Sequence, residues 1–121
     1  MVYARDYIGG RCLASKIAWD EIAPTTQVYD ADNRVIIATG PLTGTLAPTS
    51  GRTVMSSLSP RAYPRPWYMH STLGGWFGSA LKYAGYDGIV IRGRSAQPVY
   101  LEVSNGKARL MPAADLWGRG A

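Results

Sequence analysis

The stretch Val35-Ile-Ile-Ala-Thr-Gly-Pro-Leu-Thr-Gly-Thr-Leu-Ala-Pro-Thr-Ser-Gly-Arg-Thr53 passes from an apolar run into an uncharged loop and out again. The apolar run, residues 34–39, does not alternate with polar residues, which predicts a strand that is covered on both faces. The loop, residues 40–51, is rich in glycine, proline, serine and threonine. Because bare surface loops usually carry charge, we expect another part of the protein to cover it.

Helices are expected on the N-terminal side of this stretch, over residues 2–8 and 11–22, with Gly9-Gly10 between them. Apolar residues recur every three or four positions in the second helix and give it one apolar face, which is the pattern of a helix packed on a core. These residues are Leu13, Ala14, Ile17, Ala18 and Ile22. Pro24 ends this helix, and residues 23–33 are expected to form a loop.

Further strands and two helices are expected after the loop. Asn105-Gly106 is a strong signal for a hairpin, and Gly85 is placed to end a helix. The expected strands are 52–58, 67–71, 88–92, 99–103 and 108–112, with a turn-rich connection at 60–66 and helices at 75–84 and around Leu116-Trp117. Helices and strands mix without strict alternation, which predicts an α+β fold with mixed or antiparallel sheets.

The composition bounds the class of protein. A chain of 121 residues is long enough for one domain but not two, and a content of 46% hydrophobic and 17% charged residues favours a folded chain over a disordered one. The single cysteine cannot form an internal disulfide or supply the ligands of an iron–sulfur cluster. The first residues lack the apolar core of a signal peptide, and no apolar run could cross a bilayer. We therefore expect a cytoplasmic protein without a membrane partner.

The net charge of +5 comes from 13 basic against 8 acidic residues. A basic chain raises the question of nucleic acid, but these residues form no run and share no helix face. The arginines are at positions 5, 11, 34, 52, 61, 65, 92, 94, 109 and 119. This scatter is typical of surface solubility, an anionic ligand or a protein interface, and nucleic acid is not expected as a partner.

Two segments are candidates for binding a phosphate group. Arg52 follows Gly51, so the backbone could approach a ligand while the guanidinium binds its charge; the spacing excludes a P-loop. In the second segment, Gly74 and Gly75 stand at the expected start of the helix 75–84, where backbone N–H groups and the helix dipole favour an anion. The alternative for both segments is a turn with a purely structural role.

Two reactive residues are candidates of a weaker kind. His70, the single histidine, has no partner acid in the sequence pattern, so a structural role is favoured over acid–base catalysis. Cys12 stands beside apolar residues of the helix 11–22 and is expected to be a small core or interface residue. The chain has no recognisable catalytic triad or metal-ligand spacing, so we expect no catalytic or metal-binding residue in it.

The segments 35–53, 73–78 (Leu-Gly-Gly-Trp-Phe-Gly) and 81–87 (Leu-Lys-Tyr-Ala-Gly-Tyr-Asp) closely resemble the tungsten-containing aldehyde ferredoxin oxidoreductases in order and spacing. The resemblance extends to 5–11, 97–101 and 114–118, and so covers nearly the whole chain. It implies that residues 1–121 are a partial N-terminal tungstopterin-binding domain, whose first hairpin and C-terminal part are missing. It further implies an enzyme that oxidises aldehydes to carboxylic acids and passes electrons to ferredoxin.

The resemblance also implies the cofactors and the residues that contact them. The cofactors would be a tungsten or molybdenum bis-pterin and a [4Fe-4S] cluster whose ligands lie outside this chain, so the chain alone is expected to be inactive. Arg52 matches an arginine between cluster and pterin, and Thr72 and Gly74 match positions of the pterin-contacting turn, with Gly75 beside them as a further expected contact. Many family members carry Asn where this chain has Thr72, and threonine offers one hydroxyl instead of an amide.

The implied partners are ferredoxin or another electron-transfer subunit and the remaining domains of the same enzyme, with a homo-oligomer left open. Two other functions stay open as well. Tungsten-dependent benzoyl-CoA (aryl-CoA) reductases share this pattern, although Gly-Pro-Leu-Thr-Gly at 40–44 and Gly-Arg at 51–52 favour the aldehyde-oxidising branch. A non-catalytic module that binds pterin or another anion is the third reading.

Overall fold

The computed structural model describes residues 3–61 and 64–120 of the chain. Helices and antiparallel strands follow one another irregularly in this part, which confirms the predicted α+β class. The elements are α1 (Tyr3–Asp6), α2 (Gly10–Glu21), β1 (Arg34–Thr39), β2 (Thr53–Ser59), β3 (Trp67–Leu73), α3 (Phe77–Tyr83), β4 (Gly88–Arg92), β5 (Val99–Ser104) and β6 (Lys107–Pro112).

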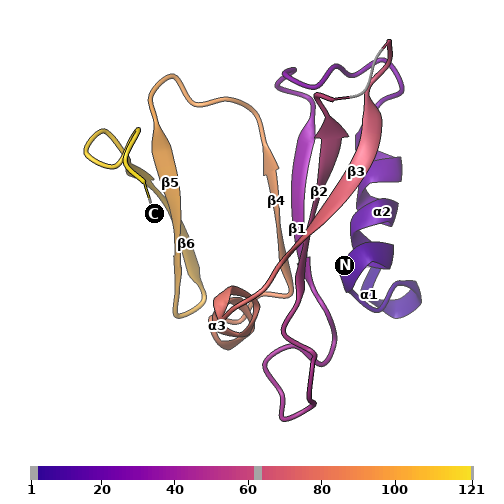
Figure 1. The fold of residues 1–121 in the computed structure, drawn as a ribbon, viewed down its shortest axis with the longest axis vertical. Helices are drawn as coiled ribbons and strands as arrows, with labels where there is room; N and C mark the ends of the chain where they lie inside the picture. Colours follow the sequence, from indigo (N-terminus) through magenta and orange to yellow (C-terminus); the bar gives the residue numbers. More distant parts are fainter. Residues whose placement is uncertain (1–2, 62–63, 121) are drawn as a thin grey trace.

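The main sheet has four strands in the order β3-β2-β1-β4, and each neighbouring pair is antiparallel (Figure 1). The run 34–39 forms β1, a central strand in which Ile36 lies opposite Ser56 of β2 and Val90 of β4. β5 and β6 pair only with each other and form a separate hairpin among the described residues.

One face of the sheet packs against α2. Ala14, Ile17 and Ala18 of the helix are buried in one cluster with Ile36 and Ala38 of β1, and Leu13 and Ile22 pack at its edge. This is the apolar face that the sequence predicts for the helix 11–22. Since Ile36 and Ala38 are two positions apart on a strand, both point to the same face.

The other face of the sheet carries α3 and the β5–β6 hairpin, on the side away from α2 (Figure 1). Ile37 of β1, Leu81 of α3 and Ile89 of β4 line a common cavity there. Strand β1 is therefore covered on both faces from Ile36 to Thr39, as predicted, while Val35 remains 37% exposed.

Two predicted turns have the expected backbone. Asn105 and Gly106 both have positive φ, 48° and 72°, which matches a two-residue hairpin turn between Ser104 and Lys107. Gly85 ends α3 at φ 92°, with its N–H bonded to the carbonyl of Lys82 and the Tyr86 N–H bonded to that of Leu81. These two bonds form a Schellman motif.

The structure corrects several expectations for the helices. The expected helix around Leu116-Trp117 is only a turn, in which both N–H groups bond to the carbonyl of Ala113. The expected helix 75–84 begins at Phe77, because Gly75 has φ 76° and cannot be helical. The expected helix 2–8 spans only Tyr3–Asp6 within the described residues. Val2 and residues 62–63 of the connection 60–66 lie outside the described residues.

The structure also bears on two expectations about burial. Cys12 is exposed and is not a core residue, because it lies away from the buried face of α2. The loop 40–51 buries Thr43, but Leu46 is fully exposed, so the described residues do not cover the loop as expected. Within residues 3–61 and 64–120, no helix is long and apolar enough to cross a membrane.

Candidate functional site

The two candidate segments meet at one end of the β2–β3 pair. Thr53 lies opposite Leu73 and Val54 opposite Thr72, so Arg52, just before β2, stands next to the residues that follow β3. The antiparallel register thus brings together segments about twenty positions apart in the sequence. All four predicted site residues, Arg52, Thr72, Gly74 and Gly75, belong to this region.

Arg52 donates one side-chain hydrogen bond, from Nη1 to Oγ1 of Thr72 over 3.3 Å, and both residues are exposed. A guanidinium carries five N–H donors. Within the part of the chain that the structure describes, Arg52 forms no ion pair. Its remaining donors are therefore open to an anion, and the bond to Thr72 orients the side chain across the strand ends.

Gly74 and Gly75 form an open stretch of backbone beside Arg52. A Cβ atom added to either glycine would meet no other atom within 4 Å. A Cβ on Gly51 would lie 3.9 Å from the carbonyl oxygen of Gly75, so the two glycine segments are neighbours. Free space over a backbone, next to an arginine with open donors, has the chemistry of a site for an anionic group such as a phosphate.

The sequence predicts Gly74 and Gly75 at the start of a helix, but the structure places them before α3. Trp76 is the N-cap of α3, so Gly74 and Gly75 lie in the turn that precedes the helix. Their φ angles explain the difference, because Gly75 is in the left-handed region and Gly74 is not. Backbone approach, and not the dipole of a seven-residue helix, is what this turn can offer a ligand.

Sequence reasoning missed three residues next to this site. Thr43, Thr53 and Gly78 are buried where the loop 40–51 meets α3. A glycine inside a short helix is unfavourable unless packing requires it, and this signal could have pointed to Gly78. Oγ1 of Thr53 is buried without a hydrogen-bond partner among the described residues.

His70 lies on β3 opposite Ser56, two positions from Thr72, and is exposed. Its side chain has no hydrogen-bond partner in residues 3–61 and 64–120. In the same residues, no group of three or more His, Cys, Asp or Glu side chains could hold a metal ion. The site therefore consists of an arginine, a hydroxyl and exposed backbone.

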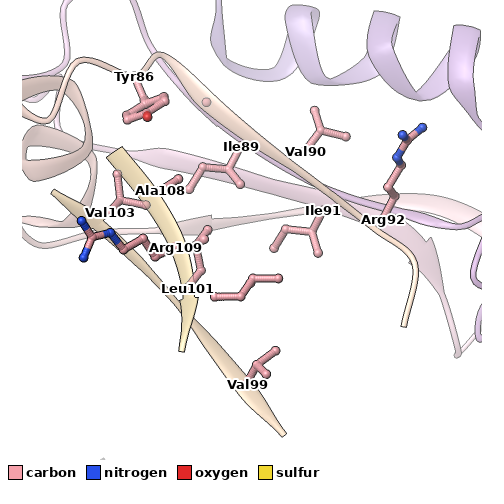
Figure 2. Close-up of a pocket in the computed structure, with 12 residues that line it drawn as sticks. Tyr86, Ile89, Val90, Ile91, Arg92, Val99, Leu101, Val103, Ala108 and Arg109 are labelled. Carbon is pink, nitrogen blue, oxygen red and sulfur yellow. The ribbon is translucent and has the colours of Figure 1, made fainter. Parts of the chain in front are cut away.

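A separate groove of about 540 Å³ lies between β4 and the β5–β6 hairpin (Figure 2). Ile89 and Ile91 of β4 point toward the hairpin, where Leu101 forms part of the opposite wall. The hairpin turn is held at one end of the groove, since the Gly106 N–H bonds to the carbonyl of Ala84. The groove is mainly apolar and contains none of the four predicted site residues.

Fold and site together define an α+β domain that presents an arginine and a glycine turn at one end of a four-stranded sheet. All 121 residues match the family described as aldehyde ferredoxin oxidoreductase, N-terminal domain. The chain belongs to this family, which confirms the resemblance seen in the sequence.

Curated relatives include tungsten-containing aldehyde ferredoxin oxidoreductases. The protein of Pyrococcus furiosus is 38% identical over 116 residues, which are 96% of this chain and 19% of that protein. The protein of Thermococcus kodakarensis is 37% identical over the same shares of both chains. The aliphatic sulfonate oxidoreductase, WOR-like subunit, of Pyrococcus furiosus is 36% identical over 119 residues, or 96% of this chain and 18% of that protein. The chain thus spans about a fifth of the length of these relatives.

A solved structure has the same fold. It is the active site complex BamBC of benzoyl coenzyme A reductase in complex with 1,5 dienoyl-CoA, with a TM-score of 0.91 and 38% identity. The match covers 98% of this chain and 18% of that chain. The names of the relatives therefore mark an oxidoreductase family with tungsten-containing members, and their substrates differ.

Proposed function

We propose that this chain is part of a tungstopterin-binding N-terminal domain of an oxidoreductase, and that Arg52, Thr72, Gly74 and Gly75 contact the cofactor. The convergence of Arg52 with the open Gly74–Gly75 turn is the observation that carries this proposal. The turn leaves room for a ligand that no side chain of the described residues fills, and the arginine supplies the matching charge.

Each residue has a distinct part in holding the cofactor. Arg52 keeps its free guanidinium donors for phosphate oxygens while one N–H is bonded to Thr72. Because Oγ1 of Thr72 accepts that bond, its hydroxyl proton remains available for the ligand. The backbone at Gly74 and Gly75 can come close to the ligand because neither residue has a side chain.

When bound, the bis-pterin cofactor would supply the redox chemistry at tungsten or molybdenum. The contribution of this chain is binding and charge. The positive Arg52, placed between the pterin and a [4Fe-4S] cluster, would stabilise the reduced and more negative forms of both. The chain has one cysteine, so other parts of the enzyme would have to supply the cluster ligands.

For the reaction, we propose oxidation of an aldehyde to a carboxylic acid with transfer of electrons to ferredoxin. The names of the tungsten-containing relatives, at 37% and 38% identity, support this proposal. Ferredoxin or another electron-transfer subunit and the remaining domains of the enzyme are the proposed partners. The described residues contain no catalytic set, so we expect residues 1–121 alone to reduce no viologen dye with an aldehyde.

An aryl-CoA reductase subunit is the second candidate, because the benzoyl-CoA reductase complex matches the fold at a TM-score of 0.91. The two candidates differ in substrate and share the proposed cofactor site. Viologen reduction by the full-length protein with benzaldehyde supports the first candidate. Viologen reduction with a cyclic dienoyl-CoA as the electron donor, and not with aldehydes, supports the second candidate.

Replacing Gly74 by alanine in the full-length protein tests the binding site. The new methyl group meets no atom within 4 Å, and the φ of Gly74 is not in the left-handed region, so the unfolding midpoint of the apo protein should not change. Because the methyl group enters the space proposed for the cofactor, tungsten and pterin content per protein should fall. Gly120→Ala is the matched control, since Gly120 is equally open and also lacks a positive φ. Unchanged cofactor content in Gly74→Ala would contradict the proposal.

A further inference from the structure

The start of α3 packs directly on the loop 40–51 and on β2. The point of closest approach is Gly78, where an added Cβ atom would lie 2.4 Å from Oγ1 of Thr53 and 3.0 Å from Cγ2 of Thr43. The carbonyl oxygen of Gly51 would be 3.3 Å away. Because real Cβ atoms do not approach other atoms to 2.4 Å, only glycine allows the helix to lie this close.

The contact continues along α3 to its C-terminal end. A Cβ atom on Gly44 would lie 3.4 Å from Cβ of Lys82 and 3.4 Å from Cε1 of Tyr83. The hydroxyl of Tyr83 donates a hydrogen bond of 2.9 Å to the carbonyl oxygen of Gly44. Helix and loop are therefore in contact at both ends of the helix, so a shift of the helix at Gly78 cannot be absorbed by sliding it along the loop.

The loop is also closed on itself where Gly78 contacts it. Oγ1 of Thr43 donates to the carbonyl oxygen of Ser50 over 2.7 Å and accepts the N–H of Gly40 over 3.2 Å. These bonds join the two ends of the loop through one buried side chain. The residues that leave the loop at Gly51 are thereby held at a set position.

This packing connects the two halves of the candidate site. Gly51-Arg52 continues directly from the loop, while Gly74-Gly75 leads through Trp76 into α3. The packing of the helix on the loop therefore acts together with the β2–β3 register in setting how far the guanidinium lies from the glycine turn. Thr53 contributes to this packing through the volume of its side chain and not through a hydrogen bond, since its buried Oγ1 has no hydrogen-bond partner in the described part of the chain.

We propose that Gly78, seated against Thr43 and Thr53, is a positioning residue that sets the spacing between Arg52 and the Gly74–Gly75 turn. The inference rests on the proposed cofactor site and adds residues that do not contact the ligand. A larger residue at position 78 pushes the start of α3 away from β2, which moves the glycine turn away from Arg52 and loosens the hold on the cofactor.

The test uses the full-length protein and three variants. Gly78→Ala introduces the clash, and Gly78→Ala/Thr53→Ala removes the atom that lies closest to the new methyl group. Gly88→Ala is the matched control, because an added Cβ at this position would also clash, at 2.6 Å from the carbonyl oxygen of Ile37. Gly88 lies in β4, which is separated from β2 by β1 and is therefore away from the candidate site. Thermal unfolding, tungsten and pterin content, and the rate of pterin release after dilution are measured for each variant.

The expected pattern separates positioning from stability. Gly78→Ala should lower the unfolding midpoint and release pterin about tenfold faster, whereas Gly88→Ala should lower the midpoint and leave the release rate unchanged. The double variant should regain part of both properties. If Gly88→Ala releases pterin as fast as Gly78→Ala at an equal midpoint, or if Gly78→Ala retains the cofactor, the positioning role is wrong.

Two further variants keep the test decisive. Thr43→Ser deletes the methyl group that faces Gly78 and keeps the hydroxyl bonds to Ser50 and Gly40, so it loosens the contact even if Gly78→Ala does not fold. We expect faster release from this variant too, and an unchanged rate counts against the inference. Arg52→Ala serves as the reference for the site: if it releases pterin rapidly while the Gly78 and Thr43 variants do not, only the positioning role fails. If Arg52→Ala also retains the cofactor, the proposed function itself fails.

Discussion

Arg52 and Thr72 are joined across neighbouring strands by a hydrogen bond of 3.3 Å from Nη1 to Oγ1. The bond links the residue just before β2 to the next-to-last residue of β3, at the end where the loop 40–51 and the glycine turn meet. The bond uses one donor of the guanidinium and leaves the other donors free. Because Thr72 belongs to β3, the bond also fixes the direction of the Arg52 side chain relative to the sheet.

Arg52→Ala should release the pterin cofactor roughly tenfold faster or more, because hydrogen bonds to a charged group contribute more than neutral ones. If Arg52 lies near the cluster, the reduction potential of the cluster should also become more negative when the positive charge is lost. Pterin fluorescence and a redox titration measure the two effects. Arg52→Lys keeps the charge and loses the planar fork, so it should restore the potential but not the full affinity. Wild-type retention and potential in Arg52→Ala would rule out both roles.

Thr72→Val removes the hydroxyl that accepts the bond from Arg52 and keeps the shape of the side chain. Pterin release should accelerate by a smaller factor than in Arg52→Ala, because the guanidinium remains but is no longer oriented. Thr72→Asn restores an acceptor and adds a donor, so it should hold the cofactor at least as well as threonine. Equal release rates in all three proteins would show that this bond does not orient Arg52.

Gly85→Ala should lower the free energy of unfolding by about 1 kcal/mol. A Cβ atom there meets nothing within 4 Å, so the loss comes from the left-handed backbone at φ 92° and not from a clash. Gly85→Asn should lose less, since asparagine tolerates this conformation. Denaturant unfolding compares the variants, and an equal loss for alanine and asparagine would point to another cause.

Ile36→Ala should cost about 2–5 kcal/mol, because Ile36 is 1% exposed in the cluster between β1 and α2. The neighbouring Val35 is 37% exposed on the opposite face, so Val35→Ala should cost clearly less. Unfolding curves of both variants test whether the buried Ile36 contributes more packing energy than the partly exposed Val35. Similar losses of unfolding free energy in the two variants would contradict the view that Ile36 is the more important packing residue.

The ion pair of Lys16 and Asp20 on α2 should give a small pH dependence of stability. The hydrogen bond from Lys16 is the main cause that lowers the pKa of the Asp20 carboxyl, and a bond from Tyr3 adds to it. Because the pKa of Asp20 is lower in the folded state than in the unfolded state, the ion pair stabilises the folded state at pH values above the unfolded-state pKa. This contribution is lost as the pH falls through the folded-state pKa. Wild type should therefore exceed Asp20→Asn slightly in unfolding midpoint at neutral pH, and the difference should vanish once the pH lies well below the lowered pKa of Asp20. A difference that persists in acid would rule this cause out.

Local and periodic features could be predicted from the sequence because their causes lie within a few residues. The periodic apolar residues of α2 and the continuous apolar segment of β1 depend on side-chain spacing. The Asn105-Gly106 turn and the end of α3 at Gly85 depend on the backbone angles of one or two residues. The helix expected around Leu116-Trp117 failed because nothing in the described residues packs its one turn into a longer helix, and short helices need such packing.

The sequence by itself determined the class of fold, the family pattern and the four candidate site residues. Only the tertiary structure decided that Arg52 reaches Thr72, that Gly74 and Gly75 form an open turn and not the first turn of a helix, and that Gly78 fits between Thr43 and Thr53. The physical reason is the range of the interactions. Helix and turn preferences act over a few neighbouring residues, whereas strand register and the approach of a helix to a loop depend on contacts between residues distant in the sequence, such as Thr53 with Leu73 and Gly44 with Tyr83.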